Sequence, residues 1–67
     1  MTDANNMKLI KPAEAAEILG VTVGTLAAWR SRGIGPRAYP LSPRAIRYDI
    51  NEINQWIFAQ RREPLGN

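Results

Sequence analysis

The hydrophobic residues between positions 12 and 32 are spaced for two short amphipathic helices. In the first helix, one face is formed by Ala15, Ile18 and Leu19. Pro12 suits the first position of this helix, and Gly20 is placed to end it. Thr22 is a competent N-cap for the second helix, and Gly33 is a natural stop for it. The pattern therefore predicts two helices joined by a tight turn, which is a helix-turn-helix.

The two faces of the second helix differ in character. Leu26 and Trp29 share the side that we expect to be buried, at about 100° of rotation per residue. The opposite side carries small residues, namely Gly24, Ala27, Ala28 and Ser31. In a helix-turn-helix the second helix offers its open face to the major groove of DNA. Small residues there let a duplex approach closely, although the same spacing also lets two helices pack together.

After residue 33 the pattern changes to one that is typical of strands. Three prolines exclude a helix there, and "RAYPL" and "AIRY" alternate as two short strands joined by a turn at "SPR", residues 42–44. We expect a small hairpin with Arg44 near its tip. A third helix is expected from about Asp49 or Asn51 to about Arg62, beginning with a capping box of Asp49 and Glu52 or with Asn51 as the cap. Its apolar stripe consists of Ile50, Ile53, Trp56 and Ile57.

These elements predict one domain that is mostly α-helical with a small β-hairpin, the arrangement called a winged helix-turn-helix. The domain is expected to span residues 9–62, with a flexible N-terminal tail at 1–8 and a C-terminal tail at 63–67. Residues 8–10 form either a short strand or an extended lead-in. Trp29 and Trp56 are expected in the core, because large aromatic side chains supply much of the buried area in so small a domain.

Positive charge is concentrated in the middle of the chain. Nine Lys and Arg against six Asp and Glu give a net charge of +3, and no acidic residue lies between Glu17 and Asp49. That stretch contains Arg30, Arg32, Arg37, Arg44 and Arg47. Such a run is typical of a surface that binds phosphates, although a solvated basic surface has the same composition.

Catalytic and membrane roles are not expected. With neither Cys nor His, the chain lacks disulfides and the usual zinc ligands, and it shows no cofactor motif or small-molecule site. Glu14 and Glu17 have no evident acid–base partner. The longest uncharged run, from Ile18 to Trp29, has twelve residues and is too short to span a bilayer. Since the N-terminus does not have the pattern of a secretory signal, the protein is expected in the cytoplasm.

The segment "PAEAAEILGVTVGTLAAWRSRG", followed by the proline-rich hairpin, "RY" and "EINQWI", resembles the excisionase and MerR-type winged-helix DNA-binding proteins. The resemblance covers roughly residues 9 to 60. It implies a second helix in the major groove and a wing that reaches the neighbouring minor groove. Small members include phage recombination directionality factors, which bend DNA beside an attachment site and bias an integrase toward excision, and AlpA-like transcription regulators. Relatives commonly carry larger polar side chains where this chain has its small face, so direct base reading is expected to be poor.

The resemblance and the basic run together indicate which residues contact DNA. They are Thr22, Val23, Gly24, Thr25, Ala28, Arg30, Ser31, Arg32, Arg37, Arg44 and Arg47. Ala28 or Val23 is expected to meet a thymine methyl group, and Thr22 or Thr25 a phosphate. Arg44 is expected to enter a narrow minor groove, and the other arginines to contact phosphates. Neutralising about five phosphates predicts a log–log salt slope of about −4 to −5.

Two side chains keep an alternative role. Arg47 either contacts DNA or pairs with Asp49 or Glu52. Phe58 lies off the apolar stripe of the third helix, so it either packs against Tyr39 or Leu41 under the hairpin or stands exposed as a contact for a partner protein.

The function that this sequence favours is that of a phage excisionase. Its expected partners are double-stranded DNA, adjacent protomers on that DNA and a tyrosine or serine integrase. The alternatives are a small phage or plasmid transcription regulator of the AlpA or MerR-like type and, in another class, a non-catalytic protein-interaction adaptor.

Overall fold

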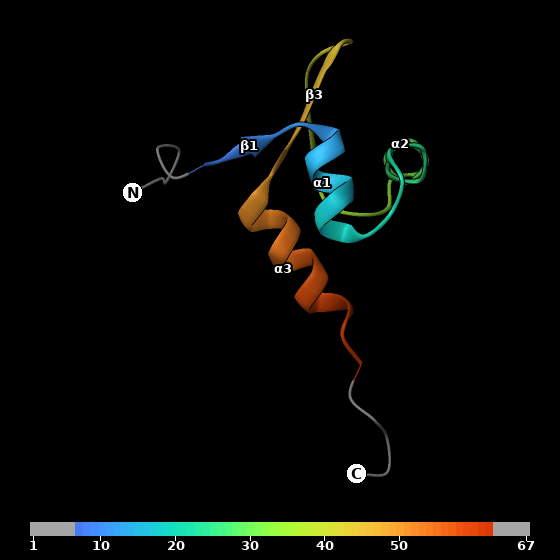
Figure 1. The fold of residues 1–67 in the computed structure, drawn as a ribbon, viewed down its shortest axis with the longest axis vertical. Coiled ribbons are helices and arrows are strands. Elements are labelled where there is room, and N and C mark those ends of the chain that lie inside the picture. The colour runs from blue at the N-terminus through green and yellow to red at the C-terminus, as the bar shows by residue number, and fades with distance from the viewer. Residues whose placement is uncertain (1–6, 63–67) are drawn as a thin grey trace.

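The computed structural model describes residues 7–62, which form three helices and a three-stranded antiparallel sheet (Figure 1). In chain order the elements are β1 (Leu9–Ile10), α1 (Pro12–Leu19), α2 (Val23–Arg32), β2 (Ala38–Ser42), β3 (Ala45–Asp49) and α3 (Ile50–Gln60). The predicted fold class, a mostly α-helical winged helix-turn-helix, is confirmed. Most of the predicted N-terminal tail, residues 1–6, and all of the predicted C-terminal tail, residues 63–67, lie outside the described residues.

Local signals set the ends of α1 and α2, as the sequence predicts. Gly20 and Gly33 end the two helices with φ angles of 73° and 76°, a left-handed conformation that a residue with a Cβ adopts only under strain. Between the helices, the Thr22 hydroxyl oxygen accepts a hydrogen bond from the Thr25 amide at 3.0 Å, which satisfies one of the unpaired donors at the start of α2. The turn between α1 and α2 is therefore fixed by residues within and beside it.

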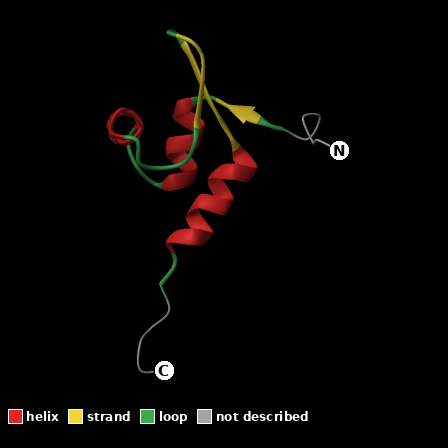
Figure 2. Cartoon of the chain, turned by 180° about the vertical axis from the view of Figure 1, so that it is seen from behind, coloured by secondary structure: helices red, strands yellow, loops and turns green. Residues whose placement is uncertain are grey.

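The sheet has the strand order β1-β3-β2, so β3 is hydrogen-bonded on both sides. Ile10 pairs with Tyr48, which shows that the segment around residue 9 is a strand. Lys8, assigned to the tail from the sequence, donates its amide to Asp49 Oδ1 at 3.2 Å and accepts from the Ile50 amide at 3.0 Å. On the other side of β3, β2 and β3 form the hairpin that projects away from the helices, and we call this hairpin the wing (Figure 2).

Each of the three helices and β3 contributes to the core. The buried hydrophobic side chains are Ala15, Ala16, Leu26, Tyr48 and Ile53. Trp29 packs against this core but is only half-buried, and so is Trp56. Their rings lie 5.7 Å apart between centroids at an interplanar angle of 42°, a tilted geometry that aromatic pairs favour. The two tryptophans, which were expected in the core, lie at its edge: Trp29 packs against the buried cluster, and Trp56 packs against the Trp29 ring.

α3 begins with Asp49 as its N-cap, but without the expected capping box. Asp49 Oδ1 accepts a hydrogen bond from the Asn51 amide at 3.4 Å, so Asp49 is the N-cap. The expected capping box with Glu52 is not formed, because the Glu52 carboxylate accepts a hydrogen bond from the Tyr39 hydroxyl at 2.8 Å. This bond ties β2 to α3. The helix ends at Gln60, two residues before the expected end, where Arg61 adopts an extended backbone with ψ 149°.

Candidate nucleic-acid interface

The small residues of α2 lie on the surface, as the sequence predicts. Gly24, Ala27, Ala28 and Ser31 are all exposed, whereas Leu26 on the opposite side is 1% exposed. No other element within residues 7–62 covers this face, so its small side chains do not serve to pack α2 inside the domain. We call these four residues the small face. It allows another molecule to approach the backbone of α2 closely.

An apolar hollow of about 170 Å³ lies beside the small face, between α2 and the wing. Val23, Ala27 and Arg30 line it from α2, and Ile46 and Tyr48 line it from β3. Val23 is 48% exposed, so the apolar surface of the hollow continues onto the outside of the helix. The recognition helix and the wing thus border one concave surface.

Arg30 lies where its charge acts on the hydroxyl of Tyr48. Burial raises the pKa of Tyr48, and the positive charge of Arg30, together with a side-chain interaction between the two, acts in the opposite direction. The phenol is neutral at physiological pH, since its ordinary pKa of 10.0 already lies well above that pH. The rim of the hollow therefore carries one net positive charge, that of an exposed guanidinium group.

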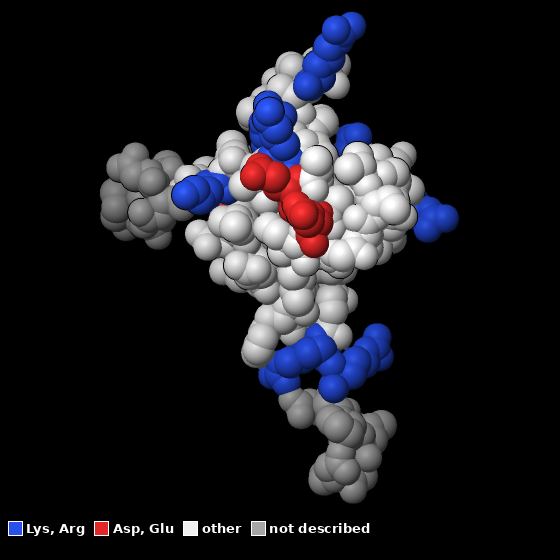
Figure 3. Space-filling view, viewed as in Figure 1, with Lys and Arg blue, Asp and Glu red and all other residues white. Residues whose placement is uncertain are grey.

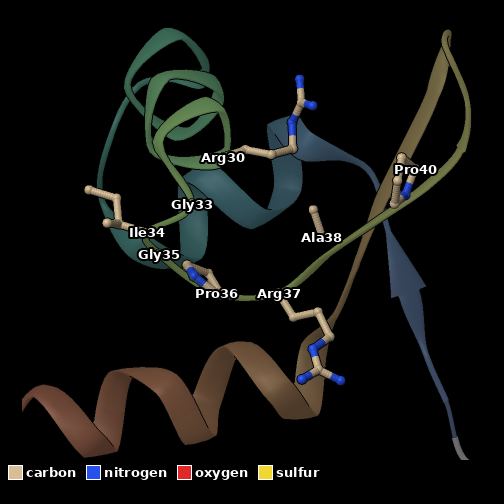
Figure 4. Close-up of a pocket in the computed structure, with 8 residues that line it drawn as sticks. All are labelled: Arg30, Gly33, Ile34, Gly35, Pro36, Arg37, Ala38 and Pro40. Carbon is tan, nitrogen blue, oxygen red and sulfur yellow. The ribbon is translucent and has the colours of Figure 1, made fainter.

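Arg37, which the sequence placed on the same phosphate-binding stripe, points elsewhere. A larger hollow of about 500 Å³ lies between the end of α2 and β2, and both Arg30 and Arg37 line it (Figure 4). Figure 4 shows the two side chains extending in opposite directions, with that of Arg37 directed toward the start of α3. The positive charge of Arg37 also opposes the rise in the Tyr39 pKa that the hydrogen bond with Glu52 causes. Arg30 and Arg37 therefore line the same hollow, but their guanidinium groups point away from one another.

The strand register places Arg47, too, away from the surface that Arg30 borders. Tyr48 pairs with Ala38 and Ile46 pairs with Pro40, so these residues share the face of the wing that turns toward α2. Tyr39 pairs with Arg47, and because successive side chains alternate, this pair lies on the opposite face. A single stripe of five arginines, as the sequence suggested, is thus divided between two faces.

Arg47 forms neither of the ion pairs that the sequence left open. Its Nη1 donates a hydrogen bond to the backbone oxygen of Ile46 at 2.9 Å. Glu52 is instead bound to Tyr39, and Asp49 accepts from the amides of Lys8 and Asn51. The side chain of Arg47 therefore lies along the back of the wing.

Arg44 occupies the position expected for it. Pro43 and Arg44 form the turn between β2 and β3, and Arg44 is exposed. Its amide donates to the Ser42 hydroxyl at 3.3 Å, which helps to fix the turn. Figure 3 shows basic atoms at the far end of the wing, beside α2 and beyond the end of α3, and acidic atoms near α1 with further basic atoms next to them. Arg32, also exposed, lies in the last turn of α2.

The two threonines at the start of α2 bind one another. The Thr22 hydroxyl donates to Thr25 Oγ1 at 3.0 Å, and Thr22 Oγ1 in turn accepts from the Thr25 amide. Thr22 is exposed and Thr25 is half-buried. Because the Thr22 proton is already donated, the Thr25 hydroxyl is the donor of this pair that remains for an external acceptor.

A tight turn between two helices, an open second helix and a projecting wing with an arginine at its tip define a DNA-binding domain of the helix-turn-helix class. Residues 9–61 match the sequence model of the family described as "Helix-turn-helix domain", and the chain belongs to that family. It is accordingly a small DNA-binding protein. Comparisons with curated proteins and with solved structures gave no significant match. Within residues 7–62, no helix has both the length and the apolar character needed to span a bilayer.

β3 contributes a side of the interface that the sequence pattern does not predict. The pattern indicates strand residues at Ile46 and Tyr48, and it places Ala27 on the small face without relating the two. The alternation in "AIRY" places Ile46 and Tyr48 on one face of a strand, which was a usable signal. That this face turns toward α2 depends on tertiary packing, which the alternation does not reveal.

Proposed function

We propose that this chain acts as a phage excisionase, a recombination directionality factor that binds and bends DNA at an attachment site and directs an integrase toward excision. The observation that supports this most is the small face of α2 together with the exposed Arg44 at the wing tip. A helix with no bidentate side chain on its open face is suited to binding DNA through backbone and shape rather than through base sequence.

In this proposal α2 enters the major groove with the small face toward the bases. Arg30 and Arg32 contact phosphates, and Arg44 enters the adjacent minor groove, where a narrow groove has an enhanced negative potential. Simultaneous contact in two grooves favours a bent duplex over a straight one. Because Arg37 points toward the start of α3 and Arg47 lies on the other face of the wing, about three positive charges meet the duplex instead of the five first expected, which makes the log–log salt slope shallower, at about −3.

Low specificity per copy implies that a defined site needs several copies side by side. Phe58 supports such assembly, because its side chain is 64% exposed rather than packed under the wing. The guanidinium carbon of Arg61 lies 4.4 Å from the centre of the Phe58 ring. An exposed aromatic ring of this kind suits a contact with an adjacent protomer or with integrase.

The proposal gives the protein no catalytic role, no cofactor and a place on DNA in the cytoplasm. A transcription regulator of the AlpA or MerR-like type would use the same fold and the same arginines, and a protein-interaction adaptor would use Phe58 and the small face without DNA.

A titration on an attachment-site fragment distinguishes these functions. Fluorescence anisotropy at two salt concentrations is expected to show salt-sensitive binding, and native gels are expected to show stepwise occupancy by adjacent copies with a bent duplex. Added integrase is expected to increase that occupancy. Binding to one isolated site without bending would favour the transcription regulator, and no binding at low salt would favour the adaptor.

A further inference from the structure

The apolar hollow between α2 and the wing is unusual for a surface that meets a polyanion. Its lining consists of aliphatic and aromatic side chains from three elements, with Pro12 contributed by α1 and Arg30 at its rim. Pro12 and Ile46 are half-buried, and Leu26 and Tyr48 form its buried floor. A duplex seated on α2 brings either water or one of its own apolar groups against this lining.

The major-groove edge of DNA has one apolar substituent, the C5-methyl group of thymine. In a helix-turn-helix the residues near the start of the second helix contact base edges, and Val23 and Ala27 lie in the first half of α2. A volume of about 30 Å³ is the share of one water molecule in the liquid. The hollow, at about 170 Å³, therefore has room for a methyl group and the ring edge that carries it.

We propose that this hollow is a thymine-methyl site, and that Val23 and Ala27 of α2 with Ile46 of β3 add a modest preference for thymine to a binding mode that otherwise depends on backbone and shape. The inference rests on the proposed binding of α2 in the major groove. It also decides between Val23 and Ala28, which were equivalent candidates in the sequence: Val23 lines the hollow, whereas Ala28 does not. The base contributes no hydrogen bond to this contact, so the preference comes from burying the methyl group.

The test compares two copies of one duplex pool that differ only in the C5-methyl groups of their thymines. A random-sequence duplex pool is enriched by binding to the full chain and then copied once with thymine and once with uracil, which lacks the methyl. Anisotropy at fixed salt is expected to give a Kd about fourfold lower for the thymine form, the effect of burying one methyl group. The enriched pool is also expected to favour thymine at a fixed position.

Two variants of α2 distinguish a contact in the hollow from a contact on the rest of the small face. Ala27→Val fills the hollow from α2 and is expected to bring the ratio of the two Kd values close to one. Ala28→Val adds the same atoms outside the hollow, and is expected to keep the fourfold ratio even if both forms bind more weakly. Should Ala27→Val fail to fold by circular dichroism, Val23→Thr takes its place, because it exchanges one methyl for a hydroxyl without changing the volume.

The outcomes distinguish this inference from the function on which it rests. Salt-sensitive binding with equal Kd values for thymine and uracil forms overturns the thymine-methyl site alone. A thymine preference that survives in Ala27→Val or Val23→Thr also overturns it. The absence of salt-sensitive binding to either pool overturns the proposed function, and the inference with it.

Discussion

Gly35 shows how a single residue fixes the path from α2 into the wing. Its φ of 83° is in the left-handed region, and a Cβ at this position would lie 3.1 Å from Cε3 of Trp29. The chain must pass this close to the indole to begin β2 at Ala38. Gly24 in α2 is the opposite case, because it has helical geometry and a Cβ there would meet nothing nearer than Thr22 Oγ1 at 3.8 Å.

These two glycines are expected to respond in opposite directions to alanine. Gly35→Ala should lower the free energy of unfolding by about 1–2 kcal/mol, since it combines a strained φ with a contact on the Trp29 ring. Gly24→Ala should raise it by about 0.5–1 kcal/mol through the better helix propensity of alanine. Thermal denaturation followed by circular dichroism measures both. A Gly35→Ala chain as stable as the parent would contradict the close packing on Trp29.

The two tyrosines are expected to titrate above the ordinary value of 10.0. The hydrogen bond to Glu52 raises the pKa of Tyr39, and burial raises that of Tyr48. Because the unfolded chain releases these protons first, stability is unaffected by them below about pH 10 and decreases as the pH rises further. Tyrosinate absorbance of the folded protein, with Tyr39→Phe to isolate Tyr48, measures the shifts. A folded chain that titrates at the ordinary value would exclude both contacts.

At the scale of elements, the helices could be predicted from the sequence and the arrangement of the sheet could not. Thr22 and Gly33 act on their own helix, so the ends of α2 follow from local chemistry. β1 has two residues, too few to show a period, and its strand character depends on pairing with β3. The division of the arginines between two faces of the wing depends on the register of Tyr39 with Arg47, which the composition of the run does not contain.

The wing provides a prediction that tests this division. Arg44→Ala should weaken duplex binding several-fold and make the salt slope shallower by about one, because one phosphate or minor-groove contact is lost. Arg37→Ala removes the same charge from the face that turns toward α3, and should leave both quantities nearly unchanged. The measurement is anisotropy over a series of salt concentrations for the parent and both variants.

Equal effects of the two substitutions would contradict the assignment of the wing faces. If Arg44→Ala changes neither the affinity nor the salt slope, the wing tip is not part of the interface. Since both side chains are exposed, neither variant is expected to change the thermal unfolding temperature by more than a surface substitution usually does.

At the scale of the whole molecule, a small core makes stability depend on the bound state. The buried hydrophobic side chains include two alanines, so Leu26, Tyr48 and Ile53 supply most of the fully buried volume. A domain of this size typically has a net stability of a few kcal/mol. A ligand that binds only the folded chain adds stability in proportion to the logarithm of its concentration.

Ile53→Ala is therefore expected to leave the chain largely unfolded on its own. The substitution removes a side chain that is 0% exposed, which costs about 2–5 kcal/mol. Duplex DNA at about 100 times its Kd should raise the free energy of unfolding by about 2.7 kcal/mol and restore much of the helical signal. Circular dichroism with and without DNA measures this. A variant that folds normally without DNA would show that α3 contributes little to the core.

Because β3 lies in the middle of the sheet, its backbone groups are paired on both sides and do not hydrogen-bond with another copy of the chain. A chain shortened to start at Lys11 would lose β1 and expose a row of backbone donors and acceptors along β3. Two such chains could then join edge to edge, and analytical ultracentrifugation is expected to find dimers or aggregates of the truncated form. By pairing with β3, β1 thus prevents self-association through that strand edge, independently of any contact that it makes with DNA.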